Sequence, residues 1–434
     1  MGVILLFAIL FVIIFLGVPV GFALGGATML AMYFFTNLDM VISAQYCFSG
    51  VNSFTLLAIP FFMLAGLVMS RGGIASRIVD FAYSLVGFFT GGLGAVSIVA
   101  CMFFGALSGS GMATTSAIGS MMIPEMSRKG YNRAYATTVC CCGGVVGPII
   151  PPSISFVLYG TIANVSISDL FIAGIIPGIL IGVLLCVTNY FMCKKNNMGP
   201  REEIPEGTTV GKFIKGRIKA IGTSVKNGFW ALLSPVIILG GIYSGVFTPT
   251  EAACVSVVYS IIISVFVYKT LDMKELYKVI VETAVLNGIT SFLVSYSTVF
   301  STYLAYASIP TMVYNFLMAT AHSKFVLLLL INIILLIVGC FIDTIPAVLI
   351  LAPILLPTVT GFGIDPVHFG VIMAVNLAIG LSTPPYGCNL FVGAAVGKIK
   401  IEEMFKYLGV FLATLIIACL IITYVPAISM FLVK

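Results

Sequence analysis

The chain of 434 residues is too apolar to fold in water. Hydrophobic residues make up 60% of it, charged residues only 8%, and its mean hydropathy is +1.17, whereas a soluble domain carries about a quarter charged residues. The net charge is +6, but the sequence contains no soluble domain on which a basic nucleic-acid site could form. The apolar runs are continuous and not alternating, which excludes a transmembrane β-barrel. The composition predicts an all-α polytopic protein of the lipid bilayer with no nucleic-acid partner.

The first apolar run, residues 4–16, is expected to be a retained span, because it lacks the basic n-region and small-residue cleavage site of a signal peptide. The eleven cysteines lie in apolar segments without CxxC spacing and are predicted to be packing residues. The predicted membrane crossings cover about 4–16, 18–35, 51–70, 131–160, 172–193, 229–247, 252–268, 281–304, 366–396 and 405–432.

Two segments, at about 93–124 and 326–357, are predicted to be re-entrant helical hairpins. In the first, the apolar stretch 93–104 stops at the polar tip GALSGSGMATT, and a second short arm returns to Pro124. At about 1.5 Å per residue, each arm would cross only half of a hydrocarbon layer about 30 Å thick. The second hairpin repeats this pattern around the tip GCFIDTIP.

Two further segments, 131–160 and 366–396, are predicted to be broken helices. The sequences GPIIPPS and GLSTPPY interrupt them, and their prolines remove backbone donors and clash with the preceding turn. Unwound backbone cannot face lipid, so both breaks must face protein or a wet cavity. The amphipathic segments 74–89 and 308–321 are expected to lie along the membrane interface. If both were short spans instead, the orientation of everything downstream would reverse.

A polar, basic segment, 194–226, separates a first repeat (1–193) from a second (227–434). With five crossings each, the two repeats would have inverted topology. With the N-terminus outside, every Lys and Arg except Lys324 and Lys434 falls on one side, which the positive-inside rule makes cytoplasmic. At a constant offset of 233 residues, the repeats pair Pro124 with Pro357, Gly130 with Gly363, Gly147 with Gly380, Pro151 and Pro152 with Pro384 and Pro385, and Gly160 with Gly393.

Helices that end inside the membrane expose unpaired backbone groups and about half a charge of helix dipole. Carbonyl ends suit sodium, whereas N-terminal ends and hydroxyl groups suit a carboxylate. We therefore expect two related cation sites built largely from backbone, one in each repeat. The candidate residues are Ala106, Ser108, Ser110, Gly147, Ile150 and Ser153 in the first repeat, and Gly339, Asp343, Gly380, Thr383 and Tyr386 in the second.

Asp343 is the strongest single candidate, because an Asp at mid-bilayer costs about 2.5 to 3.5 kcal/mol on insertion scales. It can act at an ion or substrate site, or be a structural or protonated carboxyl. Any single hydroxyl can instead bond its own helix. Glu251 is predicted to be structural, in the first turn of a helix capped by threonine. His322 and His368 are expected in connections, and the sequence holds no motif of an enzyme or ATP-driven pump.

Several motifs in order, GVPVGFALG, AIPFFMLAGLVMSRGG, GALSGSGMATTSAIG, GPIIPPS, GVFTPTEAA and GLSTPPYGCNLFV, resemble the large (DctM-like) membrane subunit of tripartite ATP-independent periplasmic (TRAP) transporters. The resemblance covers nearly the whole chain. It implies an elevator-type secondary transporter of the bacterial inner membrane that is driven by sodium. It also implies an organic-acid substrate delivered by a soluble periplasmic binding protein, and a separate small four-helix membrane subunit as partner.

The resemblance also implies two or more sodium ions and no organic cofactor. Through the segment GLSTPPY it places sodium at Gly339, Gly380, Thr383 and Tyr386, and the first-repeat counterparts follow from the internal repeat. Substrate would bind between the two hairpin tips. The residues implied are Ser108, Gly109, Ser110, Pro152, Asp343, Thr344 and Asn389. Family members carry C4-dicarboxylates, sialic acid, other sugar acids and keto acids, and the sequence does not select among them.

Other functions have less support. A sodium-driven divalent-anion symporter would share the inverted repeat and the paired hairpins but would need no binding protein. A membrane enzyme would have to use Asp343 with the tip serines, and no base, nucleophile and oxyanion donor can be read from the sequence. A passive channel fits poorly, because hairpins that enter from opposite sides favour alternating access.

Overall fold

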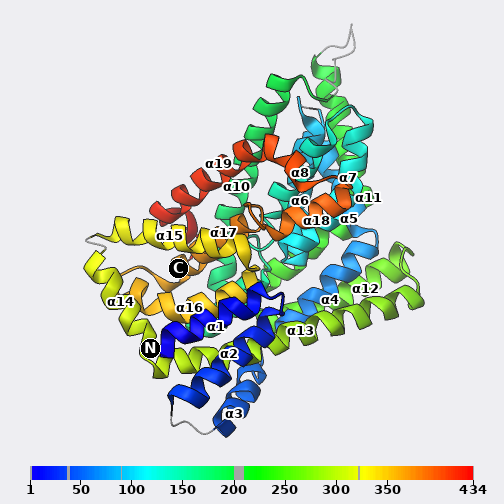
Figure 1. Cartoon of the computed structure of the whole chain (residues 1–434). Helices are drawn as coiled ribbons and strands as arrows, with labels where there is room; N and C mark the ends of the chain where they lie inside the picture. The colour runs from blue at the N-terminus through cyan, green and yellow to red at the C-terminus, as the bar shows by residue number, and fades with distance from the viewer. Residues whose placement is uncertain (1, 37–39, 89, 200–209, 321–322, 434) are drawn as a thin grey trace.

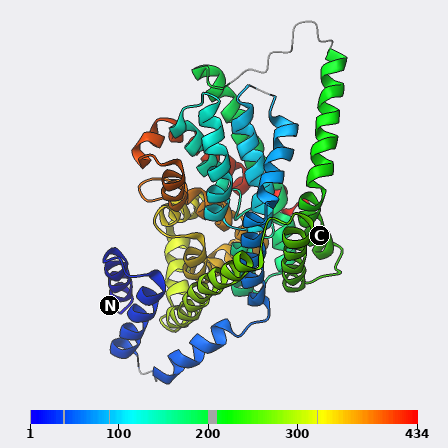
Figure 2. The same ribbon diagram turned by 90° about the vertical axis from the view of Figure 1, so that its right-hand side faces the viewer.

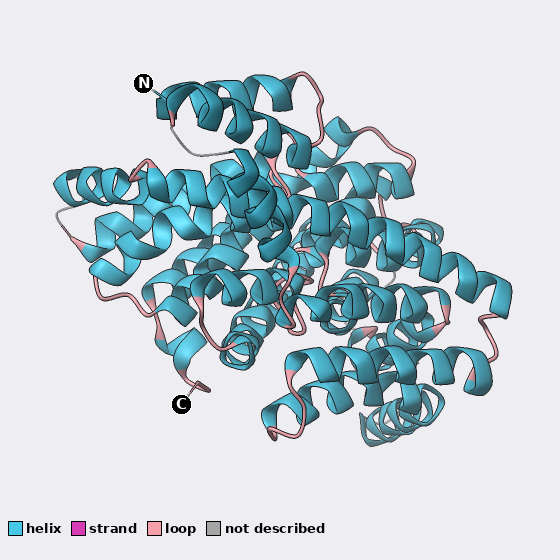
Figure 3. Ribbon diagram, turned by 90° about the horizontal axis from the view of Figure 1, so that it is seen from below, coloured by secondary structure: helices cyan, strands magenta, loops and turns pink. Residues whose placement is uncertain are grey.

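The protein is a bundle of helices joined by short turns (Figure 1). The computed structural model describes the chain except residues 1, 37–39, 89, 200–209, 321–322 and 434. The described part contains no β-strand (Figure 3). Seven of its helices are long and apolar enough to cross a membrane, or eight if the bent pair α3 and α4 forms one span. The predicted all-α polytopic fold is confirmed.

The first repeat differs from the prediction near residue 50. The crossing expected at 51–70 is helix α4, and a helix that was not expected, α3, precedes it with a bend of 62° between them. Asn52 and Ser53 interrupt the apolar run at this bend. The helices are α1 (Gly2–Phe15), α2 (Val20–Phe35), α3 (Met40–Val51), the 3-10 turn η1 (Thr55–Leu57), α4 (Ala58–Arg71), α5 (Ile74–Val86), α6 (Gly92–Ser108), α7 (Gly111–Arg128), α8 (Arg133–Gly144), α9 (Ile154–Ala163) and α10 (Ile167–Asn196).

In the second repeat, helix α11 already begins at Val210, inside the predicted polar segment, and it projects beyond the bundle (Figure 2). Helix α12 starts with a capping box in which Thr248 and Glu251 bond each other's backbone N–H groups, so the structural prediction for Glu251 is confirmed. The helices are α11 (Val210–Tyr243), α12 (Pro249–Ile262), the π-helical turn η2 (Ile263–Val267), α13 (Met273–Tyr306), α14 (Ile309–Thr320), α15 (Lys324–Phe341), α16 (Thr344–Gly361), α17 (Pro366–Gly380), α18 (Cys388–Gly397), α19 (Ile401–Tyr424) and α20 (Ala427–Met430).

Both predicted hairpins are present, but their arms are longer than expected. Helices α6 and α7 have 17 and 18 residues, and α15 and α16 have 18 each. Only two residues form each tip, Gly109–Ser110 and Ile342–Asp343. The polar residues near the tips extend the arms because they bond within the helix; the Thr114 hydroxyl, for example, donates to the Ser110 carbonyl at 2.7 Å. The prediction of half-length arms is therefore wrong. Each segment is a pair of helices joined by a tight turn, α15 and α16 are each long and apolar enough to cross a membrane, and the re-entrant course of the two hairpins stays a prediction.

Both broken helices are also confirmed. The first is α8 and α9 with the break at 145–153, and the second is α17 and α18 with the break at 381–387. Each break contains a cis peptide bond between its two prolines, at Pro151–Pro152 and Pro384–Pro385. The two breaks therefore share their backbone form as well as their glycine and proline spacing.

The two repeats interlock. Helix α18 of the second repeat packs on α7 and α8 of the first, and α9 of the first packs on α16 and α17 of the second. At these contacts Arg133 Nε donates to the Gly397 carbonyl at 2.6 Å, and the Tyr159 hydroxyl donates to the Pro366 carbonyl at 2.7 Å. We call helices α6 to α9 and α15 to α18 the hairpin bundle.

A second group of helices, which we call the frame, consists of α2, α3, α4, α11, α12 and α13. Helix α13 packs on α2, α3 and α4, and α12 packs on α4 and α11; α4, α12 and α13 run side by side in Figure 1. The frame meets the bundle where α4 contacts α6 and where α13 contacts α16. Helix α5 belongs to neither group and lies between α11 of the frame and α6 of the hairpin bundle.

Candidate functional site

The first break closes on itself. Proline at 151 and 152 removes the N–H groups that a continuous helix would direct to the carbonyls of Gly147 and Pro148. The Ser153 hydroxyl replaces one of them by donating to the Pro148 carbonyl at 2.6 Å, and its oxygen also accepts from the Phe156 N–H and so caps helix α9. Every residue of this break is buried. The carbonyl of Gly147 is left without its usual helical donor.

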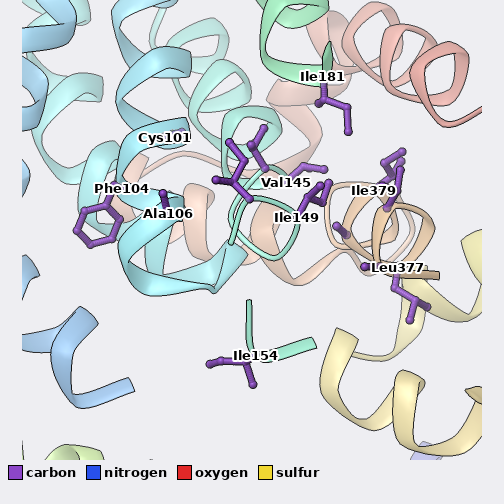
Figure 4. Packing of buried hydrophobic residues seen from close by; sticks show 14 of the residues in the cluster. Cys101, Phe104, Ala106, Val145, Ile149, Ile154, Ile181, Leu377 and Ile379 are labelled. Carbon is purple, nitrogen blue, oxygen red and sulfur yellow. The ribbon is translucent and has the colours of Figure 1, made fainter. Parts of the chain in front are cut away.

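The tip of the first hairpin packs directly on the first break. A Cβ placed on Gly109 would lie 2.6 Å from the Pro152 carbonyl oxygen, and one on Gly105 would lie 2.9 Å from the Gly147 Cα. Such short separations mean that backbone meets backbone. In Figure 4, Ala106 on the arm and Val145 and Ile149 in the break lie in one cluster. The structure thus brings together the first-repeat candidates Ser108, Gly109, Ser110, Gly147, Pro152 and Ser153.

Ala106 and Ile150 lie at the edge of this site that faces α10 and α11. Both contribute to an apolar cavity of 1,240 Å³ that α5, α6, α10 and α11 surround. Their side chains carry no polar atom, so only their backbone carbonyls could contact a cation. Within the tip, the Ser108 and Thr114 hydroxyls are 3.0 Å apart, and the Ser110 hydroxyl accepts from the Ala113 N–H and caps helix α7.

The second break is held by the first repeat. The Ser382 hydroxyl and the Asn389 amide both donate to the Cys141 carbonyl, at 3.0 and 3.5 Å, and the Cys141 thiol donates to the Asn389 carbonyl at 3.2 Å. The prediction that all cysteines merely pack therefore understates Cys141, although all eleven are free. Pro385 and Tyr386 are exposed, Tyr386 by 49%. This break is thus open on one side and braced on the other.

The second hairpin repeats the glycine contact of the first. A Cβ on Gly339 would lie 3.2 Å from the Gly380 Cα, and one on Gly380 would overlap the Gly339 backbone. The Gly387 N–H donates to the Cys340 carbonyl at 3.0 Å, which ties the break to the hairpin arm. Thr383 lies in this break, and its hydroxyl bonds its own helix at the Ile379 carbonyl at 2.9 Å.

Asp343 forms the tip of the second hairpin and caps helix α16. Its carboxylate accepts from the Thr344 N–H at 2.7 Å and from the Thr344 hydroxyl at 3.3 Å. The equivalent cap in the first hairpin, Ser110, is neutral. A helix N-terminus attracts anions, and at the second tip an acidic side chain of the protein already occupies that position. The two tips therefore differ in their capping group, an ionisable carboxyl at the second and a neutral hydroxyl at the first.

Thr115 and Ser382, near the site, were not predicted from the sequence, whereas Asn389 was predicted as a substrate residue. Thr115 Oγ1 and Asn389 Oδ1 are buried without a hydrogen-bond partner in the described structure. Gly111 at the first tip lies against the amide of Asn389, since a Cβ there would be 3.3 Å from Asn389 Nδ2. Asn389 thus faces the first hairpin. Thr115 lies in the hydroxyl-rich run SGMATTSA and Ser382 lies in the segment GLSTPPY. Both motifs had already been identified from the sequence, so these two residues could have been included in the prediction.

The predictions for histidine are resolved in part. His368 is not in a connection but is buried in the first turn of α17, where it bonds the Ser429 hydroxyl at 2.6 Å. His322 lies outside the described residues. In the part of the chain that the structure describes, no group of three His, Cys, Asp or Glu side chains could hold a metal ion. A cation at the breaks would have to be bound by carbonyl and hydroxyl oxygens, which suit hard ions.

Comparison with known proteins places the chain in a group of transporters. The model of the DctM component of tripartite ATP-independent periplasmic transporters matches residues 7–428. The chain is 40% identical over 415 residues to the isethionate TRAP transporter permease protein DctMQ of Oleidesulfovibrio alaskensis, covering 96% of this chain and 64% of that longer protein.

It is also 41% identical over 385 residues to the C4-dicarboxylate TRAP transporter large permease protein DctM of Pseudomonas aeruginosa, covering 88% of this chain and 87% of that protein. The crystal structure of the YdaH transporter of Alcanivorax borkumensis has the same fold, with a TM-score of 0.63 at 13% identity and 89% coverage of both chains.

Proposed function

The chain belongs to the TRAP transporter family as a large membrane subunit, and we propose that it imports an organic acid by sodium-coupled secondary transport with an elevator mechanism. The substrate class is a C4-dicarboxylate or sialic acid, delivered by a soluble periplasmic binding protein. A small four-helix membrane subunit is the partner within the bacterial inner membrane. The basic segment 194–226 lies on the cytoplasmic side of that membrane.

The observation that carries the proposal is the pairing of each hairpin tip with a helix break. The glycine contacts Gly105 with Gly147 and Gly339 with Gly380 bring each hairpin arm against the C-terminal end of a helix at a break. In the first break the Gly147 carbonyl has lost its helical donor to proline and can accept a sodium ion instead.

In the second break the carbonyls of Gly380 and Leu381 accept from the N–H groups of Thr383 and Asn389, and their second lone pairs would face a sodium ion. The Gly147 carbonyl in the first repeat and the segment around Gly380 and Thr383 in the second would hold sodium.

The difference in capping group between the two tips assigns roles to them. The neutral cap Ser110 leaves the N-terminus of α7 available to a substrate carboxylate. Asp343 places a negative charge at the other tip, where it favours a cation. A substrate anion between the tips would then be held by the first tip directly and by the second through sodium.

Sodium also supplies the driving force. Each sodium ion that moves inward through 100 mV contributes about 2.3 kcal/mol. Two ions would neutralise the charge of a dicarboxylate, and a third or a concentration gradient would drive its accumulation.

The elevator step requires the hairpin bundle to slide along the frame. The two bodies touch closely at one point that tests this: a Cβ on Gly66 of α4 would lie 3.5 Å from the Ser108 Cβ at the first tip, a separation that a disulfide can span. Because Ser108 is itself a predicted substrate residue, the reference is the uptake of the Gly66→Cys, Ser108→Cys double variant under reducing conditions. Oxidation should stop this uptake, and renewed reduction should return it to the reference value. Uptake that is unchanged by oxidation, with the crosslink verified by mass spectrometry, would contradict the elevator.

The function is tested by reconstitution. Proteoliposomes containing this chain and its small subunit are given labelled succinate, N-acetylneuraminate or isethionate, with and without an inward sodium gradient and a binding protein. Accumulation that requires both additions is expected. Sodium-driven uptake without the binding protein would replace the proposal by a two-component symporter, and flux that is indifferent to sodium would contradict the sodium sites.

A further inference from the structure

The apolar cavity between helices α5, α6, α10 and α11 offers little to a polar solute. Its volume is 1,240 Å³, and none of its lining residues in the described part of the chain carries a charge. Asn189, one of the few polar lining residues, is already satisfied. Its amide donates to the Gly91 carbonyl at 3.0 Å and accepts from the Tyr135 hydroxyl at 2.9 Å. Water gains few hydrogen bonds in such a space, which suits hydrocarbon instead.

The cavity is open toward the bilayer. Four of its apolar residues recur every four positions along α10, so they lie in one stripe. They are Ile179, Val183, Val187 and Phe191, which are 47%, 52%, 46% and 62% exposed. Val236 of α11 faces the same cavity and is 63% exposed. Because α10 and α11 are both long and apolar enough to cross a membrane, the surroundings of this exposed surface are lipid chains.

Along α10 the cavity has the length of one bilayer leaflet. From Ile179 to Phe191 the helix rises by about 18 Å at about 1.5 Å per residue, and half of the hydrocarbon layer is about 15 Å. At one end Gly178 of α10 packs on Ile150 of the first break, which lines the cavity. At the other end Phe191 lies one turn before Lys194. The cavity therefore runs from the level of the break to the basic end of α10.

Basic side chains gather at that end of the cavity. The Lys194 ammonium nitrogen lies 6.0 Å from the centre of the Tyr190 ring, and Tyr190 lines the cavity. Lys195 is exposed beside it, and Lys226 is exposed on α11, less than two turns before the first cavity residue of that helix. Helix α11 contains no acidic residue, and Asp80 of α5 lines a different cavity. A negatively charged group here would meet positive charge from both helices.

From this arrangement we propose that the cavity is a binding site for one anionic phospholipid of the cytoplasmic leaflet. Its acyl chains lie along the apolar stripe of α10, and its phosphate lies beside Lys194, Lys195 and Lys226. Basic pockets between membrane helices bind anionic headgroups in this way. The chain ends lie beside Ile150 and close the bilayer side of the first candidate cation site. The leaflet and this last consequence rest on the proposed function, which places the basic segment in the cytoplasm.

Native mass spectrometry of the purified complex with its small subunit tests the charge of the ligand. Phosphatidylglycerol and phosphatidylcholine with identical acyl chains are titrated separately, and the complex should retain one phosphatidylglycerol in preference to phosphatidylcholine. The Lys194→Gln, Lys195→Gln double variant should weaken binding of phosphatidylglycerol by about fivefold for each lysine and leave phosphatidylcholine unchanged. Lys406→Gln is the matched control, because Lys406 is also exposed and lies 5.5 Å from a tyrosine ring, that of Tyr407, outside the cavity. Equal binding of both lipids by the wild type would overturn the anionic site.

Gly240→Phe tests the place of the acyl chains. Gly240 lines the cavity, and a Cβ there meets nothing within 4 Å, so the ring can enter the cavity without displacing backbone. Binding of phosphatidylglycerol should fall by at least about tenfold, because the chains lose buried methylene groups. Gly288→Phe on α13 is the matched control, since a Cβ there also meets nothing within 4 Å. Equal binding by the two variants would overturn the location, and loss of the small subunit from Gly240→Phe alone would assign the cavity to that subunit instead.

Photolabelling locates the lipid in the wild-type complex, so it does not depend on any variant. Phosphatidylglycerol with a diazirine near the end of one acyl chain is bound and irradiated, and the labelled peptides are identified by mass spectrometry. Labelled residues should lie on α6 and α10 near Ala106 and Ile179. Labelling confined to helices that do not line the cavity, such as α2 and α13, would overturn the site.

The lipid site and the proposed function can fail separately, because none of these measurements depends on transport. If the complex takes up no organic acid but binds phosphatidylglycerol as described, the proposed function is wrong and the lipid site stands. If the complex transports but shows no preference for phosphatidylglycerol, the lipid site is wrong and the proposed function stands.

Discussion

The two helix breaks have the same backbone punctuation but are stabilised in different ways. In the first, Ser153 satisfies the Pro148 carbonyl and caps α9, so the break is closed and buried. At the equivalent position of the second break, Tyr386 is half exposed. This break is instead held by hydrogen bonds between Cys141 of the other repeat and its residues Ser382 and Asn389. The two repeats therefore share the position at which a helix unwinds. The backbone groups that unwinding leaves unpaired are bonded by different partners in each repeat.

The largest effect is expected at the second glycine contact. In Gly380→Ala the new Cβ would overlap the Gly339 backbone, which cannot rotate away as a side chain could. Sodium-dependent uptake should fall by about a hundredfold or more, because misplacement by about 1 Å at a site can have that effect. Gly409→Ala is the control, since a Cβ there meets nothing within 4 Å. Normal uptake by Gly380→Ala would contradict the close contact of hairpin and break.

The proposed role of the Asp343 charge at the second tip is tested by Asp343→Asn. Asparagine caps a helix about as well as aspartate, so thermal stability should stay nearly constant. Uptake at low sodium should fall by about tenfold, which corresponds to about 1.4 kcal/mol, and high sodium should restore part of it. If uptake keeps its wild-type sodium dependence, Asp343 is a structural cap only.

Ser153→Ala tests how the first break is closed. The variant leaves the buried Pro148 carbonyl without its donor and removes the cap of α9, so the free energy of unfolding should fall by about 1 to 3 kcal/mol. Tyr386→Phe, at the matching position of the second repeat, should change it by less than about 0.5 kcal/mol. Thermal unfolding of the two purified variants measures the difference, and equal losses would show that the breaks are stabilised alike.

A smaller effect is expected from Cys141→Ala. Its thiol is a weak donor to the Asn389 carbonyl, so the loss should be about 0.5 to 1 kcal/mol. Cys142→Ala is the control, because Cys142 is an equally buried neighbour that has no hydrogen bond to the second break in the described structure. It separates the loss of the hydrogen bond from the loss of volume. A larger loss in Cys142→Ala than in Cys141→Ala would mean that Cys141 merely packs.

The sequence was sufficient for features that depend on local chemistry. Prolines 151, 152, 384 and 385 mark both breaks, and the polar tips mark both hairpins, because these residue types act on the backbone next to them. The lengths of the hairpin arms were underestimated, since hydroxyl groups near a tip can bond within the helix and continue it. Helix α3 was missed because its polar residues obscure the apolar run.

Contacts between the repeats could not be predicted from the sequence. Cys141 and Asn389 are 248 positions apart, and nothing around either residue indicates that helix α18 packs on the other repeat. The same applies to Asn389 and Gly111, which bring the second break beside the first tip. Such contacts depend on how the two repeats interlock, and only the three-dimensional structure contains that information.

The most direct test of the account is the sodium dependence of the initial uptake rate in proteoliposomes of the wild-type complex. Two carbonyl sites that act together predict a sigmoidal dependence with a Hill coefficient greater than one, and no uptake when potassium replaces sodium. A hyperbolic curve would mean that a single break binds sodium, and equal uptake in potassium would contradict the assignment of both breaks as sodium sites.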